Sequence, residues 1–215
     1  MKLYNYFRSS ASYRVRIALQ LKGLAYEYIP VHLTHDGGQQ RTSQFRALNP
    51  QALVPVLAHG PETLTQSLAI IEYLEETYPE PALLPKAAAE RARVRALTLA
   101  LACEVHPLNN LRVLNYLSSK LGLNDAAKTE WYKHWVDQGF AAFEASLAQS
   151  PHTGRFCHGD TPGLADCCLV PQLFNARRFG CDLSGYPILL AIEARCQELP
   201  AFRDAAPGQQ PDAEK

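Results

Sequence analysis

The sequence predicts an α/β domain followed by an all-helical domain, on three observations. Strand and helix patterns alternate over the first 80 residues. Three prolines then fall within Tyr78–Pro85, a density typical of a linker. Beyond this stretch apolar residues recur at helical spacing almost throughout. We therefore predict an α/β domain over residues 1–80, a linker over residues 81–87 and a helical domain over residues 88–215.

The first domain opens with a strand and a helix. Lys2–Tyr6 alternates polar and apolar residues, as a half-buried strand does. A helical pattern over about Ser12–Lys22 ends at Gly23, and its wide apolar surface predicts a helix that is covered on two sides. Tyr26–His32 predicts a second strand, which Pro30 restricts to the edge of a sheet.

The remainder of this domain predicts a loop, a hairpin and a helix. Residues 33–52 are polar and contain at most a short helix near Gln44–Leu48. Val54–Ala58 and Glu62–Thr65 form the hairpin, and Ser67 is expected to cap the helix that follows. A βαβ unit followed by a hairpin and a helix is the element order of a thioredoxin-like domain.

The second domain predicts four substantial helical segments. They are Ala87–Leu121 with an interruption at Pro107, Asp125–Gln149, Leu164–Phe179 and Ile188–Leu199. Asp166 lies three residues after Gly163 and is expected to cap the third segment by accepting the Gly163 N–H, a structural role. The tail from Ala206 is expected to be mobile.

The composition excludes several classes of protein. Lys+Arg and Asp+Glu both number 21, so bulk charge does not favour a nucleic-acid or membrane-surface partner, and an anionic ligand must find positive charge locally. No apolar run reaches the roughly 18 residues of a membrane-spanning helix. The six cysteines lie in the second half without disulfide or metal spacing, which predicts free thiols in the cytoplasm.

Three serines mark the turn between the first strand and the first helix. Ser9, Ser10 and Ser12 lie where backbone N–H groups and the positive end of a helix dipole favour an anion such as a thiolate. Helix capping explains one of these hydroxyls but explains the group less well. Ala11 leaves the turn without a cysteine, which excludes thioredoxin-type disulfide exchange.

The same turn carries the pattern Ser-Ser-x-Ser-x-Arg-Val-Arg-Ile-Ala-Leu over Ser9–Leu19. Further matching blocks follow in order, at Asp36–Gln40, Ala47–Pro50, Val54–Pro55, Gln66–Glu76, His106–Asn110, Ala165–Asp166, Leu169–Gln172 and Arg178–Phe179. Over nearly its whole length the chain resembles the zeta class of glutathione transferases, the maleylacetoacetate and maleylpyruvate isomerases. The resemblance implies the two-domain glutathione transferase fold, an active site between the domains, a homodimer and a cis peptide bond before Pro55.

The resemblance also implies glutathione as the cofactor. Its binding residues would be Ser9, Ser10, Ser12, Gln40, Val54, Gln66, Ser67, His106 and Asn110. Ser10, or else Ser9, would donate the catalytic hydrogen bond to the sulfur. Gln66 and Ser67 would hold the γ-glutamyl carboxylate, and Val54 would pair its backbone with the cysteinyl moiety.

Two arginines would bind the substrate, which is a dicarboxylate. Guanidinium groups bind carboxylates with two hydrogen bonds, and the resemblance assigns this role to Arg8 and Arg178. Arg177 is expected to be a solvated or salt-bridged surface residue. Arg14 projects into the apolar side of its helix and is expected to form a salt bridge between the domains.

The implied reaction is the isomerisation of maleylacetoacetate to fumarylacetoacetate in aromatic amino-acid breakdown. The glutathione thiolate would add to the cis double bond, allow rotation and leave. Three alternatives remain. They are the same chemistry on maleylpyruvate, a general glutathione transferase or haloacid dehalogenase, which would need neither arginine, and a non-catalytic binding module.

Overall fold

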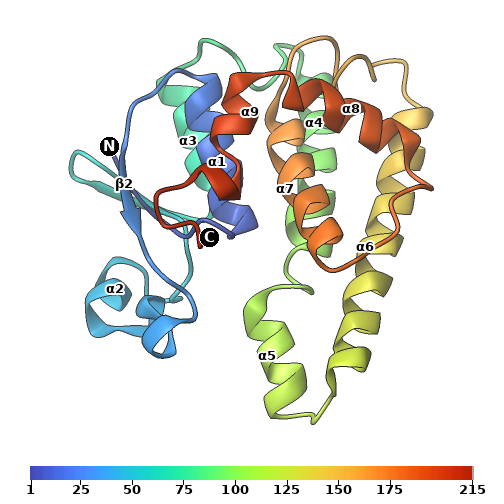
Figure 1. Cartoon of the computed structure of the whole chain (residues 1–215). Coiled ribbons are helices and arrows are strands. Elements are labelled where there is room, and N and C mark those ends of the chain that lie inside the picture. The colour runs from blue at the N-terminus through green and yellow to red at the C-terminus, as the bar shows by residue number, and fades with distance from the viewer. Residues whose placement is uncertain (215) are drawn as a thin grey trace. The chain divides into compact units, whose positions relative to one another are not determined.

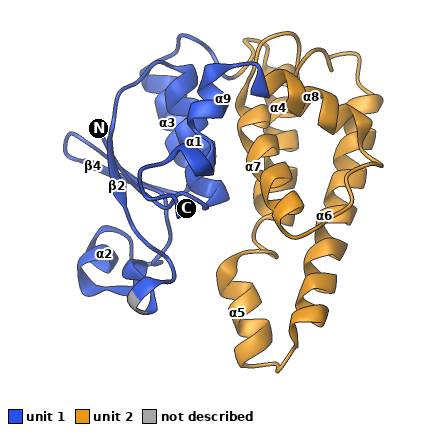
Figure 2. Cartoon of the chain, in the orientation of Figure 1, with its two compact units in different colours: residues 1–83, 197–215 blue, residues 84–196 orange. Residues whose placement is uncertain are grey.

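The computed structural model describes residues 1–214, which form two compact units. Figure 2 shows both. Unit 1 contains residues 1–83 and 197–215, and unit 2 contains residues 84–196. The C-terminal segment therefore groups with the N-terminal part of the chain, whereas the predicted helical domain extended to residue 215.

Unit 1 is built on a four-stranded mixed sheet. The strands are β1 (Lys2–Asn5), β2 (Glu27–Pro30), β3 (Val56–His59) and β4 (Glu62–Thr65). Their order is β2-β1-β3-β4, with β1 parallel to β2 and antiparallel to β3. The edge position of β2 confirms the prediction from Pro30. This is the thioredoxin-like arrangement (Figure 1).

Within residues 1–83 of unit 1 the helices are α1 (Ser10–Leu21), α2 (Ser43–Leu48) and α3 (Ser67–Thr77). Two short 3-10 turns, His35–Gly37 and Gln39–Arg41, precede α2. Helix α1 packs against α3 and against α9 (Pro200–Asp204), which explains why nine of its residues are buried. Phe45 of α2 closes a small core with Val31 and Val56.

The C-terminal tail is packed on unit 1 rather than mobile as expected. The guanidinium of Arg16 is fully buried and donates from Nε to the Ala205 carbonyl at 3.0 Å. After the 3-10 turn Pro207–Gln209, Gln210 donates from Nε2 to the carbonyls of Asp204 and Ala206 at 2.8 and 2.9 Å. The tail is ordered because a buried guanidinium fixes the residue just before it and the amide of Gln210 bonds back to the backbone there.

Unit 2 is helical. It contains α4 (Ala88–Leu99), a π-helical segment (Ala100–Val105), α5 (Leu111–Ser119), α6 (Asp125–Ala148), α7 (Leu164–Arg178) and α8 (Pro187–Gln197). Helix α7 is central, with every residue from Leu164 to Leu173 buried. Asp166 accepts the N–H groups of Gly163 at 2.8 Å and Cys157 at 2.9 Å, which confirms the predicted cap.

Two predictions from composition can be compared with the structure. No helix within residues 1–214 is both long and apolar enough to cross a membrane. All six cysteines are free thiols, and four of them are buried.

Candidate functional site

The serine turn lies between the end of β1 and the start of α1. Ser9 is the helix cap, because its Oγ accepts the Ser12 N–H at 3.2 Å. Ser10 is the first residue of α1 and is only 3% exposed. Ser12 is completely buried, and its Oγ has no hydrogen-bond partner within residues 1–214. The first turn of α1 contains no acidic residue, so the positive end of its dipole is available to an anion.

The start of α3 is a second place that favours an anion. The N-cap is Gln66 rather than the expected Ser67, because the Gln66 carbonyl accepts the first helical bond, from the Ile70 N–H at 3.0 Å. Gln66 has a φ of 68°, a strained conformation for a residue other than glycine and one that is common at functional sites. Its side chain donates to Gln51 instead of capping the helix. The first turn of α3 therefore has neither a side-chain cap nor an acidic residue.

Arg14 points its guanidinium at this helix start. The residue is 2% exposed, and Nη1 donates to Ser67 Oγ at 3.4 Å. Its Nε and Nη2 are buried and have no hydrogen-bond partner in the described part of the chain. Arg14 forms no ion pair within residues 1–214, and its salt bridge to the other domain stays a prediction. A buried cation with two unsatisfied donors is costly, so the site fits an arriving carboxylate.

Two further predicted residues lie in unit 1. The Val54–Pro55 bond is cis, as expected, and Val54 is half-buried against the Val31–Phe45–Val56 core. Gln40 is 6% exposed and donates from Nε2 to the Leu33 carbonyl at 3.2 Å. Its Oε1 is buried without a partner among residues 1–214, so Gln40 retains an unused acceptor.

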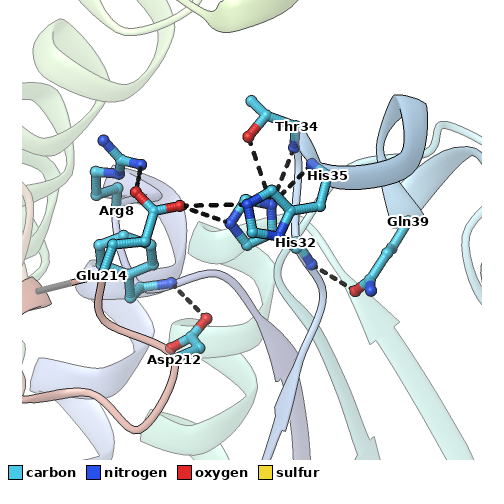
Figure 3. Close-up of polar contacts among 8 residues, drawn as sticks. Arg8, His32, Thr34, His35, Gln39, Asp212 and Glu214 are labelled. Atoms are coloured by element: carbon cyan, nitrogen blue, oxygen red, sulfur yellow. Dashed lines mark hydrogen bonds and ion pairs between the residues drawn. The ribbon is translucent and has the colours of Figure 1, made fainter.

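Arg8 lies beside the serine turn and contacts the end of the chain. Its Nη2 donates to Glu214, 206 residues away (Figure 3), and its Cζ lies 4.8 Å from the centre of the Phe7 ring. The other oxygen of Glu214 lies 3.0 Å from His32 Nε2 and 3.7 Å from His35 Nε2. The hydrogen bond from His32, supported by the charge of Arg8, lowers the pKa of Glu214 below its usual value.

His32, His35 and Glu214 also bring three possible cation ligands within 4.8 Å of one another. The Nδ1 atom of His32 accepts the backbone N–H groups of Thr34 at 3.3 Å and His35 at 2.9 Å. This pattern leaves the ring proton on Nε2, which faces Glu214. The contact is therefore a hydrogen bond to a carboxylate, and His32 lacks the free Nε2 lone pair that a metal needs.

The predicted glutathione residues of unit 2 lie around the break after the π-helical segment. His106 is half-buried and directly follows that segment. Asn110 is the N-cap of α5, and its Oδ1 accepts the Arg112 N–H at 3.1 Å. The side-chain oxygen of Asn110 is therefore already engaged in capping.

The two adjacent arginines of α7 have different environments. Arg177 forms an ion pair with Glu193, as expected for a surface residue. Arg178 ends the helix, is exposed, and places its Cζ 4.9 Å from the centre of the Phe179 ring. A cavity of about 1010 Å³ is lined by Leu123, by α6 and by residues within 181–186, and none of the predicted site residues lines it.

Comparison with known proteins gives consistent results. Residues 3–82 match the family model "Glutathione S-transferase, N-terminal domain", and residues 125–204 match "Glutathione S-transferase, C-terminal domain". The chain is 54% identical to a "Probable maleylacetoacetate isomerase" of Vibrio cholerae, over 98% of this chain and 97% of the relative.

Two solved structures are similar over the full length of both chains. The first is described as the holo structure of a maleylpyruvate isomerase, a bacterial zeta-class glutathione transferase; it has a TM-score of 0.97 and 54% identity. The second, a maleylacetoacetate isomerase of Methylobacterium extorquens AM1, has a TM-score of 0.96 and 41% identity and contains malonate and glutathione. With both of its domains matched and a zeta-class enzyme superposing over its whole length, the chain belongs to the zeta class of the glutathione transferase family.

Proposed function

We propose that this protein is a glutathione-dependent isomerase that converts maleylacetoacetate into fumarylacetoacetate. The observation that carries the proposal is the buried Arg14 beside Ser67, a cation without a carboxylate in a fold whose relatives bind glutathione. A homodimer in the cytoplasm belongs to the same proposal.

The glutathione α-carboxylate of the γ-glutamyl group would contact Arg14, Ser67 and the first N–H groups of α3. The fit is supported by the two unsatisfied nitrogens of Arg14 and by the uncapped helix start. Gln66 would add its amide, Val54 its backbone and Gln40 its unused acceptor. His106 and Asn110 complete the proposed set from unit 2.

When bound, glutathione supplies a thiolate that adds reversibly to the cis double bond, so that the bond can rotate before the thiolate leaves. Ser10 would donate a hydrogen bond to the sulfur, because Ser9 already serves as the cap of α1. A charge-assisted hydrogen bond and a helix N-terminus together supply roughly 2–3 kcal/mol, enough to lower a thiol pKa by about two units. Ser12 would support the turn from its buried position.

Arg8 and Arg178 would bind the carboxylates of the substrate and stabilise the negative charge that develops on addition. Both guanidinium groups lie close to an aromatic ring, a contact that limits their motion. Maleylpyruvate remains the alternative substrate, since relatives of both names reach 54% identity.

The test follows the ultraviolet spectra of maleylpyruvate and of a maleylacetoacetate analogue, with and without glutathione. We expect conversion to the trans isomer only when glutathione is present, and the faster substrate identifies the pathway. Tight glutathione binding without isomerisation would contradict the proposal and favour a general transferase or a non-catalytic binding module.

A further inference from the structure

Glu214 of the C-terminal tail contacts the guanidinium that the proposed substrate needs. We propose that Glu214 is a tethered competitor for the substrate carboxylate at Arg8, so that its contact with Arg8 weakens the binding of a dicarboxylate there. The inference rests on the proposed role of Arg8 in substrate binding. Three observations support it. The tail is anchored near Arg8, two side chains donate to the Glu214 carboxylate, and Glu214 takes up part of the hydrogen-bonding edge of Arg8.

The anchor is Asp212. Its Oδ2 accepts the Phe7 N–H at 3.2 Å, at the residue next to Arg8, and its Oδ1 accepts the Tyr28 hydroxyl. Figure 3 shows the carboxylate of Glu214 between the side chains of Arg8 and His32, with that of Asp212 hydrogen-bonded nearby. With Asp212 fixed only two residues away, Glu214 stays near Arg8 at a high effective concentration.

Two donors hold the carboxylate of Glu214. Oε2 accepts from Arg8 Nη2, and Oε1 lies 3.0 Å from His32 Nε2. Because His32 accepts two backbone N–H groups at Nδ1, its Nε2 carries a proton and donates even when the ring is neutral. Arg8 and His32 thus form a two-sided carboxylate cradle that the chain fills with its own side chain.

The geometry of a guanidinium lets the two carboxylates compete. A carboxylate binds it with two hydrogen bonds either across Nε and Nη2 or across Nη1 and Nη2. Nη2 carries two N–H groups, one on each edge, and one of them donates to Glu214. Arg8 Nε is buried and lacks a partner within residues 1–214. Glu214 therefore occupies part of one edge of Arg8, and its negative charge opposes the binding of a second carboxylate to the same guanidinium.

The contact is weak enough to open. The side chains of Arg8 and Glu214 are 34% and 44% exposed, and ion pairs of this exposure contribute little because water and salt screen them. Competition of this size should change the apparent affinity for a dicarboxylate by about two- to fivefold.

The test compares Glu214→Gln with Glu27→Gln, a control that removes the same charge from an exposed pair with Lys2 in unit 1. Two quantities are measured in glutathione-saturated protein: KM for the isomerase substrate and, by calorimetry, Kd for malonate. Glutathione saturation keeps malonate away from Arg14. We expect Glu214→Gln to lower both constants about two- to fivefold and Glu27→Gln to change neither.

Three results would overturn the proposal. Constants in Glu214→Gln equal to those of the control would mean that Glu214 does not compete. A raised KM or weaker malonate binding would mean that Glu214 positions Arg8 for the substrate. If Glu214→Gln binds malonate no more tightly than the wild type, and the wild type also fails to isomerise, both proposals are rejected. If the wild type fails to isomerise but Glu214→Gln binds malonate more tightly, the proposed function falls and the competition stands.

Discussion

The substitution Arg14→Met separates binding from stability at the proposed glutathione site. Methionine retains most of the length of the side chain and removes the charge. In the free protein the guanidinium has one hydrogen bond, to Ser67 at 3.4 Å, and two unsatisfied buried nitrogens. Replacing a buried, poorly paired charge by an apolar group is often neutral or stabilising. We expect the free energy of unfolding without glutathione to stay unchanged or to rise by up to about 2 kcal/mol.

The affinity for glutathione should change in the opposite direction. A charge-assisted hydrogen bond to a carboxylate contributes about 1.5–3 kcal/mol, which corresponds to a roughly 10- to 150-fold rise in Kd. Calorimetric titration with glutathione gives this number directly, and urea unfolding of the same preparation gives the stability.

Arg16→Met provides the matched control on the same helix. Arg16 is also buried, but it donates to the carbonyls of Ala205, Tyr6 and Phe7 and to the amide oxygen of Asn5. Removing it leaves four oxygens without this donor and should cost about 3–5 kcal/mol of stability. If Arg14→Met lost as much stability as Arg16→Met, or bound glutathione within about twofold of wild type, Arg14 would be a structural residue and the argument would fail.

Further predictions concern the serine turn and the α7 cap. Ser10→Ala should raise the thiol pKa of bound glutathione by about one to two units, measured from the ultraviolet absorbance of the thiolate against pH. Ser9→Ala should instead cost about 1 kcal/mol of stability through the lost cap, and a larger pKa change in Ser9→Ala would reverse the assignment. Asp166→Ala should lower the free energy of unfolding in urea by about 3–5 kcal/mol, because the buried Cys157 N–H and the partly buried Gly163 N–H lose a charged acceptor; a loss below about 1 kcal/mol would contradict this account.

Local sequence patterns predicted most of the fold. The alternation in Lys2–Tyr6, the position of Pro30 and the long periodic segment Asp125–Gln149 each correspond to an element of the structure. These features depend on neighbours in sequence, which a single chain displays. The cap of α7 was predictable for the same reason, since Gly163 and Asp166 are three residues apart.

The features that sequence analysis missed depend on contacts between distant residues. Nothing near Glu214 indicates Arg8 as its partner, and the order of the tail depends on hydrogen bonds such as those of Asp212 with Phe7 and Tyr28. The unpaired state of Arg14 could not be predicted, because an arginine on an apolar helix face usually has a buried partner. Ser67 was expected to be the cap of α3, but the backbone of Gln66 takes that position.

The central claim is that glutathione acts as a cofactor and is regenerated. The most direct measurement counts glutathione and trans product in one reaction mixture over many turnovers of maleylacetoacetate or maleylpyruvate. The account predicts that product accumulates in large excess over the enzyme while the glutathione concentration stays constant. Consumption of one glutathione for each substrate molecule would contradict it and would identify a conjugating transferase.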